Sequence, residues 1–361
     1  MKRWLQVGIL GLAAGCAILP VDPWTIERGF STRFYPAVQQ QLTSLSNLAP
    51  FALFDVLTLA GAAVLIRTLV VGWRRARLER RWAVVLRVLG SIATAAAVVY
   101  LLFLGTWGFN YRRLPMTERL VMAHGAPDTD AVVALGLQAV ERLNALHSEA
   151  HAVGWTETPL SDAPLRGAYA AVQGWLSDAP PAVPGRLKTT IYGPYFRWTS
   201  IDGMVNPFAL EVIKNPDLLP FEHPFVAAHE WAHLAGYADE SEANFVGWLT
   251  CVRAGAPAGY SGWLYLYWQI NGELGADARA TLWNALADGP REDVQAIADR
   301  IRRGQLPSLR TASWRVYDSY LRANRVQEGI RSYGEVVTLI LRARFDEGWV
   351  PVRRASTGLS R

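Results

Sequence analysis

The sequence predicts a helix-dominated α+β protein in which three N-terminal membrane-spanning helices precede a globular domain. Hydrophobic residues make up 51% of the 361 residues and the mean hydropathy is +0.10, which is high for a purely soluble protein. The apolar stretches are concentrated in the first third, and the composition changes after Asn110. We therefore expect a membrane region at residues 1–109 and a globular domain, large enough for its own core, at residues 110–361.

Three apolar stretches, at about residues 4–20, 50–73 and 82–109, are the predicted membrane helices. Roughly 20 residues are needed to cross about 30 Å of hydrocarbon, and the last two stretches meet this length. The first stretch is short, as in a cleaved signal peptide. It lacks a small-x-small cleavage site followed by a polar segment, so a retained anchor is the favoured interpretation.

The distribution of arginine and lysine predicts the orientation of these helices. The loop at residues 74–81 is rich in arginine, and Lys2 and Arg3 precede the first stretch. By the positive-inside rule both segments are cytoplasmic, and three crossings place residues 110–361 outside the cytoplasm. We expect a multi-pass protein of the inner, cytoplasmic membrane of a bacterium, with the lipid bilayer as a partner.

The segment between the first two apolar stretches, residues 21–49, has the composition of an amphipathic or interfacial segment. Its aromatic side chains suit the headgroup region of a bilayer. These are Trp24, Phe30, Phe34 and Tyr35.

The net charge of +5 does not indicate a nucleic-acid partner. Residues 1–109 hold eleven Lys and Arg against four Asp and Glu, which leaves a charge of −2 for residues 110–361. The basic character thus belongs to the membrane region. The only two cysteines, Cys16 and Cys251, exclude a disulfide framework and a cysteine-rich metal site. The lipoprotein-like string at residues 12–16 is attributed to chance.

The globular domain is predicted to consist mainly of helices with a few short strands. Periodic apolar residues predict a helix over residues 130–153, and helices are also expected from Phe225 onward and over residues 313–345. A connector rich in proline and glycine, residues 179–185, precedes predicted strands at residues 189–192 and 204–213, the latter broken at Pro207.

The motif His229-Glu230-Trp231-Ala232-His233 is the strongest functional signal in the chain. Histidines at i and i+4 of a helix project from one face and can bind one Zn²⁺, and the intervening Glu230 can take a proton from an attacking water. The alternative is that these are merely polar positions on a helix. The flanking residues are apolar, however, so each polar group would then need a buried partner, which one metal ion supplies at once.

A catalytic zinc needs a third protein ligand, and Glu240 is the predicted one. Gly236 can end the helix in a left-handed conformation and let the chain turn back. Asp239 and Glu242 have the spacing of a capping box for the next helix, which would leave Glu240 free to bind the metal. Asn244, four residues later, could then hydrogen-bond a histidine ligand. Glu242 and Asp239 remain alternatives as the third ligand, as do Mn²⁺ and Co²⁺ for the metal, although two imidazoles and a carboxylate favour zinc.

The segment Glu240-Ser241-Glu242-Ala243-Asn244 resembles the Glu-x-x-Ala-Asn helix of gluzincin peptidases. The whole chain also resembles an uncharacterised family of bacterial membrane proteins that is grouped with zincin-like metallopeptidases. The matching motifs are Pro50-Phe51, Trp107-Gly108-Phe109-Asn110-Tyr111-Arg112, the Glu240 segment with Phe245, Tyr260-Ser261-Gly262, Tyr317-Asp318-Ser319-Tyr320-Leu321 and Arg331-Ser332-Tyr333-Gly334. The resemblance implies a zincin-like peptidase domain but no known substrate. The interval from His233 to Glu240 is shorter than in typical gluzincins.

These observations predict a zinc metallopeptidase that acts on extracytoplasmic peptides or proteins, with Glu230 as general base and His229, His233 and Glu240 as ligands. The alternative is a non-catalytic zinc-binding envelope protein that binds a partner or senses a ligand. The sequence contains no signal for an oligomeric state.

Secondary candidates around the motif are weaker. Tyr260, Arg331 and Tyr333 could stabilise an oxyanion, and residues 203–213 could align a peptide as an edge strand. His223 is expected to end a loop rather than bind metal, and the aromatic run at residues 263–268 is expected to pack a core.

Overall fold

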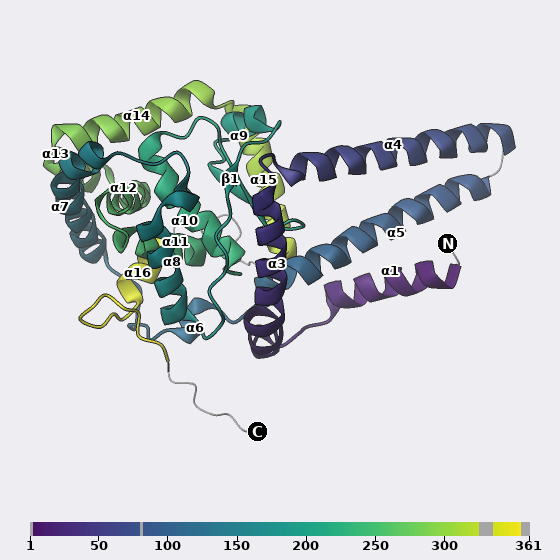
Figure 1. Ribbon diagram of the computed structural model, residues 1–361, viewed down its shortest axis with the longest axis horizontal. Coiled ribbons are helices and arrows are strands. Elements are labelled where there is room, and N and C mark those ends of the chain that lie inside the picture. The colour runs from purple at the N-terminus through teal and green to yellow at the C-terminus, as the bar shows by residue number, and fades with distance from the viewer. Residues whose placement is uncertain (1–2, 80–81, 325–334, 355–361) are drawn as a thin grey trace.

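The computed structural model describes residues 3–79, 82–324 and 335–354, and within them the chain is helix-dominated with one small sheet. Figure 1 shows a compact helical body from which α1, α4 and α5 project together on one side. The predicted helix-dominated α+β class is therefore confirmed.

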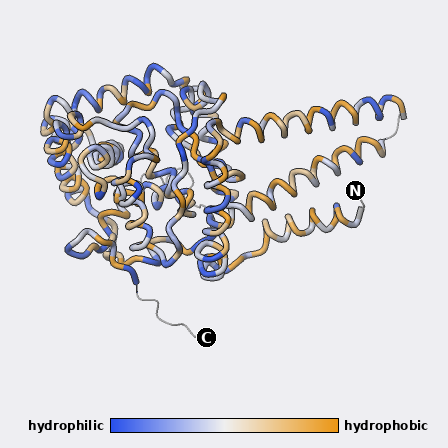
Figure 2. The backbone as a smooth tube through the Cα atoms, in the orientation of Figure 1, coloured by the Kyte–Doolittle hydropathy of each residue, from blue (hydrophilic) through white to orange (hydrophobic). Residues whose placement is uncertain are grey.

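Two of the projecting helices are long and apolar enough to cross a membrane. These are α4 (Leu53–Glu79) and α5 (Trp82–Thr106), and most of their surface is not covered by other parts of the protein. Figure 2 shows that the projecting helices are mainly hydrophobic. Both fall where the sequence predicts membrane helices. Arg80 and Arg81, which belong to the predicted cytoplasmic loop, lie outside the described residues.

The first apolar stretch forms a shorter helix, α1 (Arg3–Ile18). At 1.5 Å per residue its 16 residues extend about 24 Å, which is less than the hydrocarbon thickness of about 30 Å. Helix α1 and the segment Pro23–Leu48 meet at an angle of 113°, and by length and composition they could enter a membrane only together, as one broken span or as a re-entrant loop. The chain therefore has two or three helical spans by length and composition.

The segment predicted to be interfacial is helical and packs on the body. It consists of α2 (Pro23–Thr25), the π-helical η1 (Ile26–Phe34) and α3 (Tyr35–Leu48). Trp24 and Phe34 are exposed, but the headgroup location predicted for Tyr35 is wrong. Its side chain is buried, and its hydroxyl donates to the carbonyl of Leu234 over 2.8 Å. A phenol can bury its ring in a protein core when its hydroxyl finds an acceptor there, as it does here.

Helix α3 is also fixed to the body by polar side chains. Gln39 donates to the carbonyl of Val183 over 2.8 Å, and the buried Thr43 hydroxyl donates to the carbonyl of Leu210 over 2.8 Å. This helix therefore belongs to the packing of the body, although it lies between two apolar helices in the chain.

The first turn of α4 is bound to the sheet by Glu211. The Glu211 carboxylate accepts the backbone N–H groups of Leu53 and Phe54 over 2.9 and 2.6 Å. Lys188 Nζ lies 2.8 Å from the same carboxylate, and both charged side chains are fully buried. The negative charge suits the N-terminus of a helix, whose first N–H groups lack partners. This apolar helix therefore starts directly at the body, without a flexible linker.

The sheet has the order β1-β3-β2, with strands Leu187–Lys188 (β1), Gly203–Asn206 (β2) and Glu211–Lys214 (β3). β1 is parallel and β2 antiparallel to the central β3. The strand region predicted at residues 204–213 is thus confirmed, and it forms two strands, β2 and β3, with a break that includes Pro207. The strand predicted at residues 189–192 is wrong, because the Asp55 carboxylate accepts hydrogen bonds from Thr190 Oγ1 and the Ile191 N–H, and Gly193 begins a helix.

The body is otherwise built of helices packed around a continuous apolar core. The helix predicted at residues 130–153 is α7 (Thr129–Val153), which packs along α12. Leu137, assigned to its apolar stripe, is exposed, whereas Ala139, Val140 and Leu143 are buried. The remaining elements are η2 (Gly108–Arg112), α6 (Met116–Arg119), η3 (Pro159–Ser161), α8 (Ala163–Leu176), α9 (Gly193–Thr199), η4 (Pro220–Glu222), α10 (His223–Leu234), α11 (Glu240–Val252), α12 (Ala256–Glu273), α13 (Ala276–Ala285), α14 (Asp288–Gly304), α15 (Pro307–Ala323) and α16 (Glu335–Arg342).

Candidate metal and catalytic site

Helix α10, which carries the His-Glu-x-x-His motif, lies in the core of the body. Ala228 and Trp231 are fully buried on it. The Trp231 indole N–H donates to the carbonyl of Gly185 over 2.7 Å, and the Tyr169 hydroxyl donates to the carbonyl of Trp231 over 2.5 Å. Packing and hydrogen bonds on several sides therefore hold this helix in one position, as a catalytic or ligand-binding element requires.

The chain turns back after α10 as predicted. Gly236 has a φ of 83°, the left-handed conformation that favours glycine, and a Cβ atom there would lie 2.9 Å from Asn110 Oδ1. Asp239 then caps α11, because its carboxylate accepts the N–H groups of Ser241 and Glu242. This turn delivers Glu240, the first residue of α11, back to the histidines.

The reciprocal half of the predicted capping box is wrong. Glu242 does not reach back to Asp239. Its buried carboxylate accepts the N–H of Met116 and lies 3.1 Å from the Arg119 guanidinium. Of the three acids, the structure brings only Glu240 to His229 and His233, and these three residues form the histidine cluster. Neither Asp239 nor Glu242 belongs to it.

His229, His233 and Glu240 bring three ligand atoms together. The two histidine Nε2 atoms lie 3.1 Å apart, and Glu240 Oε2 lies 3.4 Å from each of them. Bonds of about 2.0–2.1 Å at tetrahedral angles place adjacent ligand atoms about 3.3 Å apart around Zn²⁺. The three distances match the edges of one face of such a tetrahedron, so these residues could hold a metal ion.

The hydrogen bonds of these residues leave the facing atoms free for such an ion. His233 Nδ1 lies 2.7 Å from the carbonyl of Tyr237, which can only accept, so Nδ1 carries the proton and the lone pair of Nε2 faces the cluster. Glu240 Oε2 is buried and accepts no hydrogen bond from the described residues. A buried carboxylate oxygen without a donor is costly, and a cation at this point would satisfy it.

The cluster favours positive charge. Burial lowers the pKa of His233, but the neighbouring Glu240 carboxylate outweighs burial and raises that pKa to about 9. Burial raises the pKa of Glu240, yet the two histidines outweigh it and hold that pKa well below its usual value. Both shifts show that the carboxylate and the imidazoles stabilise positive charge at this point, as the binding of a divalent cation requires.

Glu230 lies beside the cluster, in a position restricted by the sheet. Its Oε1 is 4.0 Å from His229 Nε2, and its Oε2 is buried without a partner among the described residues. Burial raises the pKa of this carboxyl, although both histidines oppose the shift. A Cβ atom at Gly203 would overlap Glu230 Oε1 and lie 2.8 Å from Cδ, so only glycine leaves room for the carboxylate.

A family model described as "Protein of unknown function (DUF3810)" matches residues 30–341. The chain belongs to this family. The match covers α3, the apolar helices α4 and α5, and all the residues of the histidine cluster. No curated protein and no solved structure matches the chain. The predicted membership in a family of unknown function is thus confirmed.

Two aromatic residues of this DUF3810 protein hydrogen-bond the ligand residues of the cluster, and a third packs on Phe225 of α10. None of the three was predicted as a site residue. The Tyr317 hydroxyl donates to Glu240 Oε1 over 2.7 Å. The Trp107 indole N–H donates to the carbonyl of His233 over 2.9 Å, and its ring packs edge-on against that imidazole. Tyr265 stacks on Phe225 with 3.6 Å between ring centroids, and its buried hydroxyl has no partner among the described residues. The sequence places Tyr317 and Trp107 within family motifs, but it gives no sign that they meet α10 and α11.

Other predicted site residues lie elsewhere. Asn244 makes no hydrogen bond to either histidine among the described residues, so the predicted contact is wrong. The Tyr237 carbonyl occupies His233 Nδ1, and both His229 Nδ1 and the Asn244 amide nitrogen are buried without a partner among the described residues. His223 is outside the cluster, as expected, with its Nε2 3.2 Å from Lys214 Nζ. Tyr260 donates to Asp293 instead of facing the cluster. Arg331 and Tyr333 lie outside the described residues.

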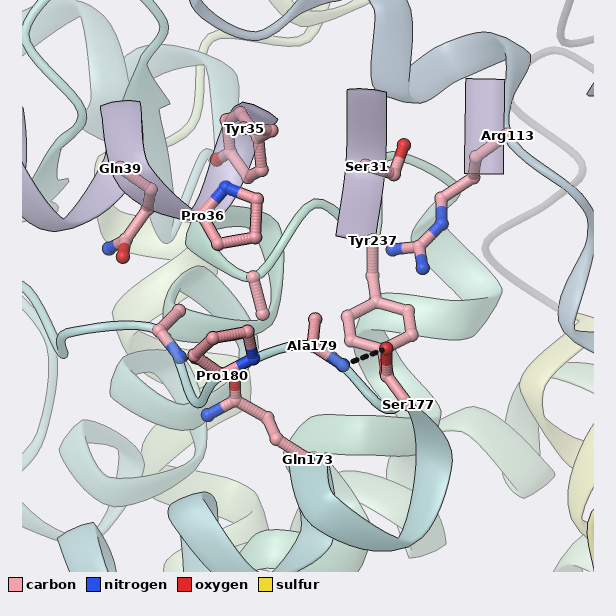
Figure 3. Close-up of a pocket in the computed structure, with 12 residues that line it drawn as sticks. Ser31, Tyr35, Pro36, Gln39, Arg113, Gln173, Ser177, Ala179, Pro180 and Tyr237 are labelled. Atoms are coloured by element: carbon pink, nitrogen blue, oxygen red, sulfur yellow. Dashed lines mark hydrogen bonds between the residues drawn. The ribbon is translucent and has the colours of Figure 1, made fainter. Parts of the chain in front are cut away.

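A separate small pocket lies where the N-terminal helices meet the body (Figure 3). It is lined by side chains from η1 and α3, including Ser31 and Gln39, and by Gln173, Arg113 and Tyr237 from the body. None of the three cluster ligands nor Glu230 lines it. This pocket is therefore distinct from the histidine cluster.

Proposed function

We propose that this DUF3810 protein is a membrane-anchored zinc metallopeptidase. The observation that supports it best is the set of three ligand-atom distances of 3.1–3.4 Å between His229, His233 and Glu240, with Glu230 adjacent. Two imidazoles and one carboxylate are a frequent ligand set of catalytic zinc, and they leave a fourth position open. When bound, zinc would polarise a scissile carbonyl and lower the pKa of water.

Glu230 is the general base in this proposal. Its raised pKa favours accepting a proton from the attacking water, and the same carboxyl can then donate that proton to the leaving amine. Gly203 limits the space around this carboxylate and so restricts its orientation. A base that is already held in one orientation loses less conformational entropy when the transition state forms, which lowers the barrier.

Tyr265 is the best-placed candidate to stabilise a developing oxyanion. Its ring stacks on Phe225, which precedes His229 by one helical turn, and its hydroxyl is buried without a partner among the described residues. A buried donor without an acceptor is costly in the free protein. An oxyanion of the substrate would supply that acceptor only during the reaction.

Strand β2 is the candidate binding edge for an extended peptide. It is an outer strand of the sheet, and its first residue, Gly203, touches the carboxylate of Glu230. A peptide that pairs with the free edge of β2 would pass the histidine cluster, and backbone hydrogen bonds would align it. Extended peptide or protein segments are therefore the proposed substrates.

The proposed location of the site is the extracytoplasmic face of the inner membrane, close to the bilayer. Trp107, the residue after α5, hydrogen-bonds the last turn of α10. The arginine-rich loop between α4 and α5 favours the cytoplasmic side, which puts the opposite end of α5 and the body outside. Substrates near the membrane surface fit this arrangement.

The decisive experiment compares the wild type with Glu230→Gln in the full-length, detergent-solubilised protein. We expect Glu230→Gln to retain one zinc ion per site, measured by elemental analysis, and to lose at least about 100-fold of the hydrolysis of a peptide library, because the base is removed. Glu141→Gln, an exposed substitution on α7, is the matched control and should retain full activity.

The same variant distinguishes a peptidase from a binding or sensing protein. If Glu230→Gln retains zinc and also restores the wild-type phenotype to cells that lack the protein, the peptidase proposal is wrong. A non-catalytic zinc protein is then indicated. If neither protein binds zinc, the proposed chemistry is excluded altogether.

A further inference from the structure

A second group of potential metal ligands lies between α7 and α14. His147 and His151 are four residues apart on α7, and Asp293 lies on the facing α14. His151 Nε2 is 2.8 Å and His147 Nε2 is 3.6 Å from the same atom, Asp293 Oδ2. The two imidazole centroids are 4.2 Å apart, and one ligand atom from each residue lies within 4.8 Å of the others.

The carboxylate of this group is held in place by a third helix. Asp293 is buried, and the Tyr260 hydroxyl on α12 donates to its Oδ2 over 2.5 Å. A hydrogen bond of this kind orients a ligating carboxylate and is typical of residues that support a metal site. His147 and His151 are partly exposed, so an ion can reach them from solvent.

Gly289, in the first turn of α14, provides the space for His147. A Cβ atom at this position would lie 2.6 Å from Nε2 and 2.7 Å from Nδ1 of that imidazole. The close approach of the α14 backbone therefore holds the ring against Asp293. Any other residue at position 289 would displace it.

We propose that His147, His151 and Asp293 form a second binding site for a divalent transition metal such as Zn²⁺. Imidazole and carboxylate ligands in this number suit zinc and related ions. The distances of 2.8 and 3.6 Å from Asp293 Oδ2 bracket the spacing of about 3.3 Å expected around a tetrahedral ion. Water would complete the coordination, since His151 is open to solvent.

The bound ion connects α7 to α14, and through α14 it supports the histidine cluster. Arg300 follows Asp293 by two helical turns, so both lie on the same face of α14. The Arg300 guanidinium lies 2.6 Å from Glu222 and 3.0 Å from Asp202, the residue before Gly203. The second site thus fixes the helix that positions the chain beside Glu230.

The zinc content of four forms of the full-length protein tests this proposal. After equilibration with Zn²⁺ and removal of excess ion, we expect two zinc ions in the wild type, one in His147→Ala/His151→Ala and one in His229→Ala/His233→Ala. The variant with all four substitutions should bind none. The His229→Ala/His233→Ala protein isolates the second site, so its zinc content does not depend on the proposed peptidase chemistry. Equal zinc content in the wild type and His147→Ala/His151→Ala overturns the proposal.

A matched pair of glycine variants provides a second measurement without removing a ligand. In the His229→Ala/His233→Ala background, Gly289→Ala should weaken zinc binding at least tenfold, because the new Cβ displaces His147. Gly272→Ala is the control, since a Cβ on that exposed helical glycine meets no atom within 4 Å. At the same zinc concentration, zinc should raise the unfolding temperature of the control more than that of Gly289→Ala. Equal zinc affinity in the two variants also overturns the proposal.

Discussion

The Tyr317 hydroxyl donates a 2.7 Å hydrogen bond to Glu240 Oε1 and leaves Oε2 of the same carboxylate facing the two histidines. This contact joins α15 to the first residue of α11. It selects the orientation of the carboxylate, which otherwise could rotate away from the imidazoles. Tyr317 therefore determines which oxygen is available to a metal ion.

Replacing Tyr317 with phenylalanine is expected to weaken zinc binding by about 10–100-fold, because the partner that orients Glu240 is lost while the ring remains. Competition with a chromophoric chelator measures this affinity. Tyr320→Phe is the matched control on the same helix, since Tyr320 contacts Phe103 and Tyr111. Equal losses in the two variants would show that the hydrogen bond to Glu240 has no special part in binding.

Gly203→Ala should reduce peptide hydrolysis by about 100-fold and leave the zinc content unchanged. The added Cβ overlaps the Glu230 carboxylate, and a displacement of about 1 Å of a catalytic group has an effect of this size. The three atoms nearest to this Cβ all belong to Glu230, and none belongs to the proposed zinc ligands. Gly174→Ala on α8, where a Cβ meets no atom within 4 Å, controls for the general effect of replacing glycine. Undiminished hydrolysis by Gly203→Ala would remove Glu230 from the proposed mechanism.

The sequence predicts what depends on local spacing and misses what depends on distant packing. The i, i+4 histidines, the turn at Gly236 and the return of Glu240 are all encoded within twelve residues. Trp107 and Tyr317 lie more than 70 residues from the groups they contact, and nothing in their local sequence specifies those contacts. The headgroup assignment of Tyr35 failed for the same reason, because its acceptor lies on Leu234.

The buried pair of Lys188 and Glu211 is expected to be essential for the attachment of α4. Lys188→Met leaves an unpaired carboxylate in a fully buried place, which costs about 3–5 kcal/mol of stability. Thermal unfolding in detergent measures the loss. Arg302→Ala, which breaks the exposed pair with Asp299, should change the unfolding temperature little. Similar small effects of both substitutions would show that the N–H groups of α4 and the Asn206 side-chain amide, which also donates to Glu211, stabilise this carboxylate adequately without Lys188.

The proposed topology can be tested by labelling single cysteines with a membrane-impermeant maleimide. Cys16 and Cys251 are first replaced with serine and alanine. A cysteine at Ala76, which lies among the arginines at residues 74–77 near the end of α4, should react only after the membrane is permeabilised. One at the exposed Glu347 should react in intact spheroplasts. The reverse pattern would place the body in the cytoplasm and exclude extracytoplasmic substrates.

His223 should make the stability of the body depend on pH, independently of metal binding. Burial, and then the adjacent Lys214 ammonium, lower the pKa of its imidazole to about 4, whereas an unfolded histidine has a pKa of about 6.5. Between these two values the unfolded chain binds more protons than the folded one, so the free energy of unfolding falls as the pH falls. At 1.36 kcal/mol per pH unit, the loss between pH 7 and pH 5 is about 2 kcal/mol.

His223→Gln removes this proton uptake, so its unfolding free energy should decrease less than that of the wild type over the same interval. Denaturant unfolding of both proteins with a chelator present makes the comparison without a contribution from bound metal. The buried imidazole accepts from Lys214 in its neutral form, so the wild type should be the more stable protein at pH 7 and lose this advantage towards pH 5. Parallel curves for the two proteins would show that the imidazole is already free to bind a proton in the folded state.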